Sequence, residues 1–442
     1  MAQTIIATHI VKPSSPTPPA SKIHKLSFFD QMQPPIYIPL IFLYENNQSS
    51  QQQEISKRLR QSLSEILAIF YPIAGTVVQN SHVDCDDAGA EFVEARVHAP
   101  LSHITENPNF EKLVKQLSAT AAGAVAARNL SVKASFFECG GFAVGVSLSH
   151  KLGDGPSAAA FVRAWAETCR GEASGIIHPS HGQTHLSVHP SFDMALHFPP
   201  LPSPSPWPSM HPEVLSEKTV MRRLVFDKEK VERIWKLEAS RSEVKDPTRV
   251  EAVSALLWRS FIAALKKAGT GTTSFPTAQV VNLRPRAGLP DGAFGNCIVG
   301  AAAALSLGEG EDGDVVSRLR AAIRGVEDGF VNGVVKDEKL LRMMHEFSDA
   351  LREPGSCVFV SWVRFGLYEA DFGWGKPSRV CNGYQYPNVV LLMEAPAGDG
   401  IEAWANIVDD RFFQLLRSSC DELLGEDVRA ARSCPKLTSV LK

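Results

Sequence analysis

Apolar residues recur along both halves of this chain in the two spacings that mark strands and helices. Residues 132–138 and 142–150 are apolar runs on either side of Gly140-Gly141, which predicts two strands joined by a turn. In the second half, short apolar runs predict strands and apolar residues at helical spacing predict amphipathic helices. These segments are a strand leading into a helix over 223–240, a helix over 248–265, a strand pair at 388–396 and 401–408, and a helix over 409–424. The pattern predicts a mixed α and β fold.

Proline interrupts this pattern near the middle of the chain. Residues 190–212 contain eight prolines in 23 positions, a density that blocks helices and sheet interiors and favours extended backbone. A chain of 442 residues also exceeds the size at which one hydrophobic core usually stops growing. We therefore predict an N-terminal domain over 1–189, a crossover linker over 190–212 and a C-terminal domain over 213–442.

The segment SLSHKLGDGPS, residues 147–157, places a histidine four positions before an aspartate. His150 ends the apolar face of the second strand, because side chains of a strand alternate between its two faces. An apolar stripe over 156–170 predicts a helix directly afterwards, with a turn of glycine and proline between the two elements. His150 and Asp154 then lie on opposite sides of this turn, so their spacing does not place them on one helix face.

Both residues have a structural and a chemical interpretation. Asp154 suits the N-cap of the following helix, and His150 suits a core-edge histidine with a satisfied hydrogen bond. The sequence contains no G-x-S-x-G nucleophile elbow and no HExxH zinc motif. A lone histidine at the end of a buried strand nevertheless suits a general base that acts on a substrate hydroxyl. The pattern alone leaves both interpretations open.

A second short stretch, DFGWGKP at 371–377, places Trp374 between two glycines. Glycine lets the backbone bend tightly and approach a ligand closely, and the indole offers one N–H donor and no acceptor. The alternative is a buried tryptophan at a β-turn, whose indole has found a hydrogen-bond partner.

Composition narrows the class of protein. The formal net charge of −3 gives no global reason to expect nucleic acid or an anionic membrane as partner. The eight cysteines are scattered without a CxxC pair, which is typical of reduced thiols in a cytosolic protein. The N-terminus lacks the pattern of a secretory leader, and the apolar stretch at 36–44 is too short to span a bilayer. We expect a soluble cytoplasmic protein.

The two stretches together resemble the hallmarks HxxxD and DFGWG of the BAHD family of plant acyl-CoA-dependent acyltransferases, in the same order and in the same halves of the chain. Further matches to that family run along nearly the whole chain, at 25–44, 70–76, 137–155, 250–258 and 281–296. The opening KPSSPTP followed by KLSFFDQ is most similar to the branch of alkaloid and terpenoid O-acetyltransferases.

The resemblance implies two chloramphenicol-acetyltransferase-like domains, each a mixed β-sheet with helices, with a channel between them. Acyl-CoA would enter from one face as co-substrate and the acceptor alcohol from the other, with no bound cofactor, no metal and a monomeric chain. His150 would deprotonate the acceptor hydroxyl, and the Trp374 indole would donate to the oxyanion. Asp154 would turn away from the channel and pair with Arg284.

The resemblance also implies supporting residues. Asp371, with Gly373 and Gly375, would hold a loop near the CoA entrance, and Asn296 would support the site. Ser254 is the candidate for contact with CoA, and Arg286 and Lys376 are possible neighbours of its phosphates.

We therefore predict transfer of an acetyl group from acetyl-CoA to a hydroxyl of a plant alkaloid or terpenoid, without a covalent acyl-enzyme. The first alternative keeps this mechanism with benzoyl-, tigloyl- or hydroxycinnamoyl-CoA as donor. The second is a catalytically silent paralogue that binds small molecules. A histidine-rich segment at 178–197 departs from the family pattern, and we expect an exposed loop there rather than a metal site.

Overall fold

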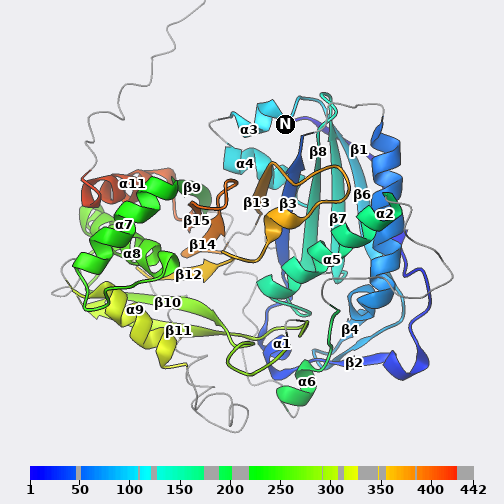
Figure 1. Ribbon diagram of the computed structural model, residues 1–442, viewed down its shortest axis with the longest axis horizontal. Coiled ribbons are helices and arrows are strands. Elements are labelled where there is room, and N and C mark those ends of the chain that lie inside the picture. Colours follow the sequence, from blue (N-terminus) through cyan, green and yellow to red (C-terminus); the bar gives the residue numbers. More distant parts are fainter. Residues whose placement is uncertain are drawn as a thin grey trace, which may run out of the picture.

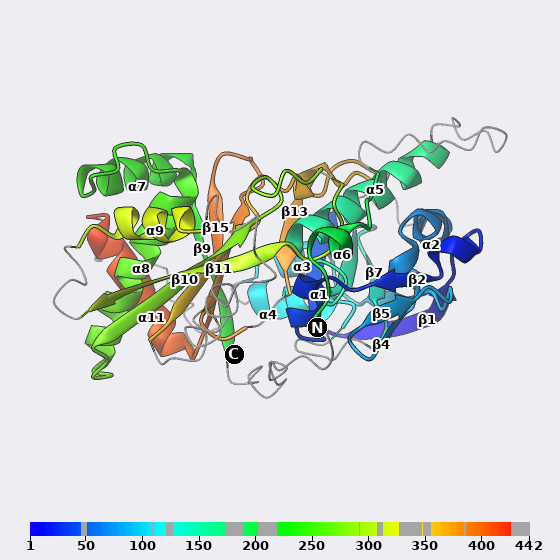
Figure 2. The same cartoon turned by 90° about the horizontal axis from the view of Figure 1, so that it is seen from below.

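Two six-stranded sheets dominate the protein, one formed mainly by each half of the chain (Figure 1). The structure is a computed structural model that describes residues 1–45, 51–107, 110–120, 127–173, 189–201, 219–290, 292–306, 313–326, 347, 355–383 and 386–425. Seen from below, the two halves again lie side by side (Figure 2). The fold is mixed α and β, as the apolar pattern predicted.

The first sheet has the strand order β1-β6-β7-β8-β3-β13, and all neighbours are antiparallel except β6 and β7. Its strands are β1 (Gln3–Val11), β3 (Tyr37–Tyr44), β6 (Ala90–Val97), β7 (Leu130–Phe137), β8 (Phe142–Ser149) and β13 (Arg379–Asn382); a smaller sheet contains β2 (Ile23–Lys25), β4 (Thr76–Val78) and β5 (His82–Asp84). The strands β7 and β8 confirm the predicted pair around Gly140, whose φ of 91° suits glycine.

Helices α2 (Gln52–Ile69) and α5 (Gly155–Ala173) pack against each other and share a core with the fully buried strands β3 and β8. The indole Nε1–H of Trp165 donates to Ser62 Oγ at 3.0 Å and links the two helices. The short helices are α1 (Phe28–Met32), α3 (Ser102–Thr105), α4 (Phe110–Val114) and α6 (Met194–His197), with 3-10 turns at Pro19–Ser21, Tyr71–Ala74, Lys115–Leu117 and Leu367–Glu369. The predicted helix after the HKLGD segment is therefore present.

The second sheet has the order β11-β10-β12-β14-β15-β9, in which β12 runs parallel to both of its neighbours. Its strands are β9 (Val220–Phe226), β10 (Ser274–Asn282), β11 (Ile298–Ser306), β12 (Cys357–Ser361), β14 (Val389–Glu394) and β15 (Ile401–Ile407), and the helices of this half are α7 (Lys228–Ser240), α8 (Arg249–Ala268), α9 (Val315–Arg324) and α11 (Asp410–Leu423). A capping box of Thr248 and Glu251 starts α8, and Gly269 with a φ of 69° ends it. The helices and strands predicted in this half are confirmed.

Strand β13 crosses from the second half of the chain into the first sheet. Its residues pair antiparallel with β3, with Val380 opposite Phe42 and Cys381 opposite Ile41, and Figure 1 shows it at that edge. The first sheet therefore contains one strand from the second half of the chain. No local pattern in the sequence predicted this exchange.

The predicted linker lies only partly within the described residues. Residues 189–201 contain α6 and pack on the first half, where Phe28 N–H donates to Phe198 O at 3.0 Å, but 202–212 lie outside the described residues. The domain boundaries at 189 and 213 stay predictions. Within the described part of the chain, no helix has both the length and the apolar character needed to cross a membrane.

Candidate active site

His150 follows the last residue of β8 and precedes the turn into α5. Every residue of β8 is buried, and the backbone N–H of His150 donates to Ile36 O at 2.8 Å, which fixes where the strand ends. The imidazole keeps part of its surface exposed and lines a cavity. A buried strand thus delivers one histidine to the edge of the core, as the alternation of side chains predicted.

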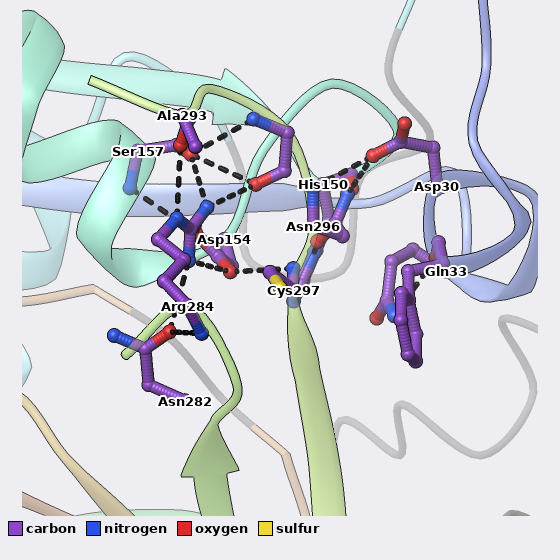
Figure 3. Close-up of polar contacts among 12 residues, drawn as sticks. Asp30, Gln33, His150, Asp154, Ser157, Asn282, Arg284, Ala293, Asn296 and Cys297 are labelled. Carbon is purple, nitrogen blue, oxygen red and sulfur yellow. Dashed lines mark hydrogen bonds and ion pairs between the residues drawn. The ribbon is translucent and has the colours of Figure 1, made fainter. Parts of the chain in front are cut away.

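Asn296 and Asp30 hold the His150 ring (Figure 3). The Nδ1–H of His150 donates to Asn296 Oδ1 at 3.0 Å, because an amide oxygen can only accept. The Asn296 amide Nδ2 donates to the His150 carbonyl and to Asp30 Oδ1, each at 2.8 Å. Nε2 of His150 has no protein partner within the described residues, so it is the ring nitrogen left for a substrate.

Desolvation lowers the pKa of His150 below its ordinary value of 6.5. This effect outweighs the opposing influence of the His150 carbonyl, of the Asp154 carboxylate and of the Asn296 hydrogen bond. A histidine with a lowered pKa is neutral at pH 7, and a neutral imidazole can accept a proton.

Asp154 has three structural partners and does not line the cavity. It is the N-cap of α5, where Oδ1 accepts from Ser157 N–H at 3.1 Å. Its two carboxylate oxygens also accept from the Arg284 guanidinium at 2.8 and 3.0 Å, and Oδ2 accepts from Cys297 N–H at 2.9 Å. Both the predicted N-cap and the predicted pairing with Arg284 are confirmed.

The Asp154–Arg284 pair joins the two halves of the chain inside the core. Asp154 has no exposed surface and Arg284 is 6% exposed. Desolvation would raise the pKa of Asp154, but the guanidinium and the hydrogen bonds outweigh it and hold the pKa below 3.8. The guanidinium also donates to Ala293 O, Gly295 O, Ser157 Oγ and Asn282 Oδ1, so each of its N–H groups has an acceptor. A buried charge needs such partners.

The cavity beside His150 lies between the two halves and has a volume of about 130 Å³. Its wall in the first half consists of Gln33, Pro34, Ile38, His150, Gly155 and Pro156, and its wall in the second half consists of residues from β10, β11, β12 and β14 with the aromatic side chains of Phe347, Trp362, Phe365 and Tyr386. None of the described lining residues is Asp, Glu, Lys or Arg. The wall is mostly apolar, with a few polar groups that can orient a ligand.

Comparison with known proteins decides the family. The Transferase family profile matches residues 1–412. Vinorine synthase of Rauvolfia serpentina is 38% identical over 424 residues, which are 93% of this chain and 95% of that protein. The chain belongs to the BAHD family.

Other relatives place this BAHD protein among acyltransferases of specialised metabolites. Stemmadenine O-acetyltransferase of Catharanthus roseus is 37% identical and covers 96% of this chain and 98% of that protein. Limonoid 7-O-acetyltransferase of Citrus sinensis is 34% identical, with 93% and 95% covered. The crystal structure of vinorine synthase superposes with a TM-score of 0.78 at 37% identity over 96% of this chain and 98% of that one. The protein is an acyltransferase with the two-domain BAHD fold.

Trp374 of the DFGWG motif does not lie beside His150, and its predicted role as oxyanion donor is wrong. Its ring contacts Phe142 edge to face at 5.7 Å, and the Arg58 guanidinium lies 4.3 Å from its centroid. Phe142 begins β8 whereas His150 follows its end, and a rise of about 3.3 Å per residue puts roughly 26 Å between them. The motif therefore packs at the opposite end of the strand.

Asp371 stabilises the loop of the same BAHD motif. Its Oδ1 accepts from the N–H groups of Gly373 at 2.7 Å and Gly375 at 3.0 Å, and both glycines have positive φ, at 102° and 91°. Positive φ favours glycine. At both positions the backbone N–H points toward the Asp371 carboxylate. That this loop lies near a CoA entrance stays a prediction.

Ser254 lies inside α8 with no exposed surface, so the structure lends no support to its predicted contact with CoA, which stays a prediction. Arg286 donates to the Asn282 carbonyl, and Lys376 forms an exposed ion pair with Glu369. Neither contact tests their predicted place near the CoA phosphates.

Trp362 is the cavity residue that the sequence analysis missed. It directly follows β12, and a Cβ added to Gly155 would lie only 2.5 Å from its Nε1, so the indole nitrogen packs where only glycine leaves room. The place of Trp362 in the fold could have indicated a site residue, because it follows the carboxyl end of β12. That strand is parallel to β10 and β14, and ligands often bind at the carboxyl ends of parallel strands. Trp362, not Trp374, brings an indole to the cavity of His150.

The histidine-rich segment at 178–197 lies mostly outside the described residues, which include only His189 and His197 of its five histidines. Among described residues, no group of three or more His, Cys, Asp or Glu side chains is arranged to hold a metal ion.

Proposed function

We propose that this BAHD protein transfers an acetyl group from acetyl-CoA to a hydroxyl of an alkaloid or terpenoid, with His150 as general base. The observation that carries the proposal is the His150 imidazole, which has Nδ1 bound to Asn296 and Nε2 open at a cavity between the halves. Relatives named as alkaloid and limonoid O-acetyltransferases support the substrate class and the donor.

In the proposed reaction, Nε2 of His150 takes the proton of the acceptor hydroxyl while that oxygen attacks the thioester carbonyl. A tetrahedral oxyanion forms, and its collapse breaks the carbon–sulfur bond and expels the CoA thiolate, which takes the proton back from His150. No serine or cysteine of the described residues hydrogen-bonds to this histidine. Direct transfer without an acyl-enzyme is therefore the route that the side chains support.

Trp362 is the proposed donor to the oxyanion. Its indole N–H lies at the cavity wall beside Gly155, at the start of α5, and it has no acceptor group of its own. A donor fixed in place stabilises charge that develops in the transition state without reorganising.

The cavity wall favours an uncharged acceptor over a protonated amine. A buried cation needs a carboxylate, and none occurs among the described lining residues. Aromatic and aliphatic side chains instead offer the broad apolar contact that a polycyclic terpenoid alcohol or a neutral alkaloid presents.

A thiol-release assay with acetyl-, benzoyl-, tigloyl- and hydroxycinnamoyl-CoA against a panel of alkaloid and terpenoid alcohols tests the proposal. We expect turnover with acetyl-CoA, and preferred turnover of a bulkier acyl-CoA would favour the alternative donor. Ligand binding without CoA release from any pair would favour the silent paralogue. The cytoplasmic location and the monomeric state remain predictions.

His150→Ala tests the general base directly. General base catalysis contributes about 10²–10⁴-fold, so we expect kcat to fall by that factor while the circular dichroism spectrum and the melting temperature stay close to those of the parent protein. Retention of most activity would remove the histidine from the mechanism.

A further inference from the structure

Asp30 is a buried carboxylate that contacts two different elements with its two oxygens. It is 2% exposed and belongs to α1. Its Oδ2 accepts from Ser27 N–H at 2.9 Å, and the Asp30 N–H donates to Ser27 Oγ at 3.2 Å, which together form the capping box of α1. Oδ2 also accepts from Ser27 Oγ–H at 2.6 Å. Its Oδ1 accepts from the backbone N–H and from the side-chain Nδ2 of Asn296, both at 2.8 Å. One oxygen caps a helix and the other reaches the site.

The carboxylate dictates which way the Asn296 amide points. An ionised carboxylate only accepts hydrogen bonds, so the amino end of the amide must face Asp30. The amide oxygen then faces His150, and an oxygen there requires a proton on Nδ1. The proton on Nδ1 leaves the lone pair on Nε2, and His150 lines the cavity.

We propose that Asp30 is a positioning residue that sets the tautomer of His150 through Asn296; the inference rests on the proposed role of His150 as base. Without the carboxylate, the amide can rotate and present its amino end to Nδ1. The ring then carries its proton on Nε2 and has no lone pair toward the acceptor hydroxyl. The His150 carbonyl remains as a second acceptor for the Asn296 amino group, so the loss is partial.

A purely structural role for Asp30 makes a different prediction. Helix α1 ends at Met32, and Gln33 and Pro34 directly after it line the cavity. Loss of the helix cap would therefore disturb the cavity wall and substrate binding. Ser27→Ala is the matched control, because it removes the hydroxyl contacts of the same capping box and leaves Oδ1 and Asn296 in place.

The test compares Asp30→Ala with Ser27→Ala in kcat, in KM and in the NMR spectrum of [¹⁵N]histidine-labelled protein, where the His150 signals are identified by their absence from His150→Ala. A charge-assisted hydrogen bond supports an effect of about 10-fold or more. We expect Asp30→Ala to lower kcat by that factor with little change in KM and to shift His150 toward the Nε2–H tautomer. Ser27→Ala should keep the Nδ1–H tautomer and kcat within about 2-fold.

Equal losses of kcat in both variants, or an unchanged tautomer in Asp30→Ala, would overturn the inference. If Asp30→Ala does not fold, Asn296→Ala takes its place, because Asp30 acts on His150 through the Asn296 amide. We expect Asn296→Ala to lose the Nδ1–H tautomer of His150. Persistence of that tautomer in Asn296→Ala would contradict the inference. The NMR readout is independent of turnover. An active His150→Ala enzyme would therefore refute the general base while the tautomer still decides the role of Asp30.

Discussion

Two neighbouring residues at the end of β8 carry side chains whose charged forms are both disfavoured. His150 faces the cavity between the halves, and desolvation lowers its pKa. Lys151 packs on the first half, where Nζ donates to Gln31 O at 3.0 Å and burial lowers its pKa to about 8. The Lys151 charge further lowers the pKa of His150. The His150 imidazole is thereby kept neutral at pH 7, as the proposed role of general base requires.

This environment predicts the pH dependence of the reaction. His150 must be neutral to accept a proton, and its pKa lies below 6.5, so activity should persist as pH falls through 6.5 and decline only below that value. The measurement is kcat/KM between pH 5 and 8, which reports the pKa of the free enzyme. An acidic limb with its midpoint at or above 6.5 would contradict the lowered pKa.

At the scale of elements, the turn from β8 into α5 was predictable and the docking of the DFGWG loop was not. Side-chain alternation and the glycine–proline turn were enough to separate His150 from Asp154 and to cap α5. The Arg284 partner lies 130 residues away from Asp154 and came only from the family resemblance. Trp374 was predicted to lie beside His150, but it contacts Phe142 at the other end of β8. A loop motif in the sequence does not indicate which end of a strand the loop packs against.

The two tryptophans should respond differently to substitution by phenylalanine. Trp362→Phe removes an N–H at the cavity and keeps a ring, so we expect kcat to fall by on the order of 100-fold. Trp374→Phe loses ring area against Phe142 and Arg58, so we expect a lower melting temperature and kcat within about 3-fold of the parent. Parallel kcat and melting measurements distinguish them, and the reverse pattern would reinstate Trp374.

At the scale of the whole molecule, polar contacts inside the core connect the two halves. Asp154 of the first half and Arg284 of the second form a buried ion pair. Glu402 of β15 accepts from Arg223 of β9 at 2.8 Å and from Arg379 of β13 at 3.2 Å, so β13 is tied to the second sheet while its backbone pairs with the first. The proline-rich segment predicted two domains and the family resemblance implied a channel between them, but long-range pairings of this kind leave no periodic pattern in the sequence.

The bridging pair should behave as one unit in stability measurements. Asp154→Ala and Arg284→Ala each leave a buried charge without its partner and should each lower the free energy of unfolding by about 3–5 kcal/mol. The double variant should cost clearly less than the sum, because neither charge then remains. Urea denaturation of the four proteins gives the coupling, and strictly additive losses would show that the pair does not act together.

Strand β13, which belongs to the second half of the chain but pairs with β3 of the first sheet, limits how this enzyme can be recombined with its relatives. A chimera that joins the first half of one acyltransferase to the second half of another at the proline-rich segment would give β3 a foreign neighbour at residues 379–382. An unmatched β3 would expose a fully buried strand, and an unpaired apolar edge promotes aggregation. A chimera that keeps β3 and β13 from one parent therefore needs three crossovers, one in the proline-rich segment and one on each side of residues 379–382.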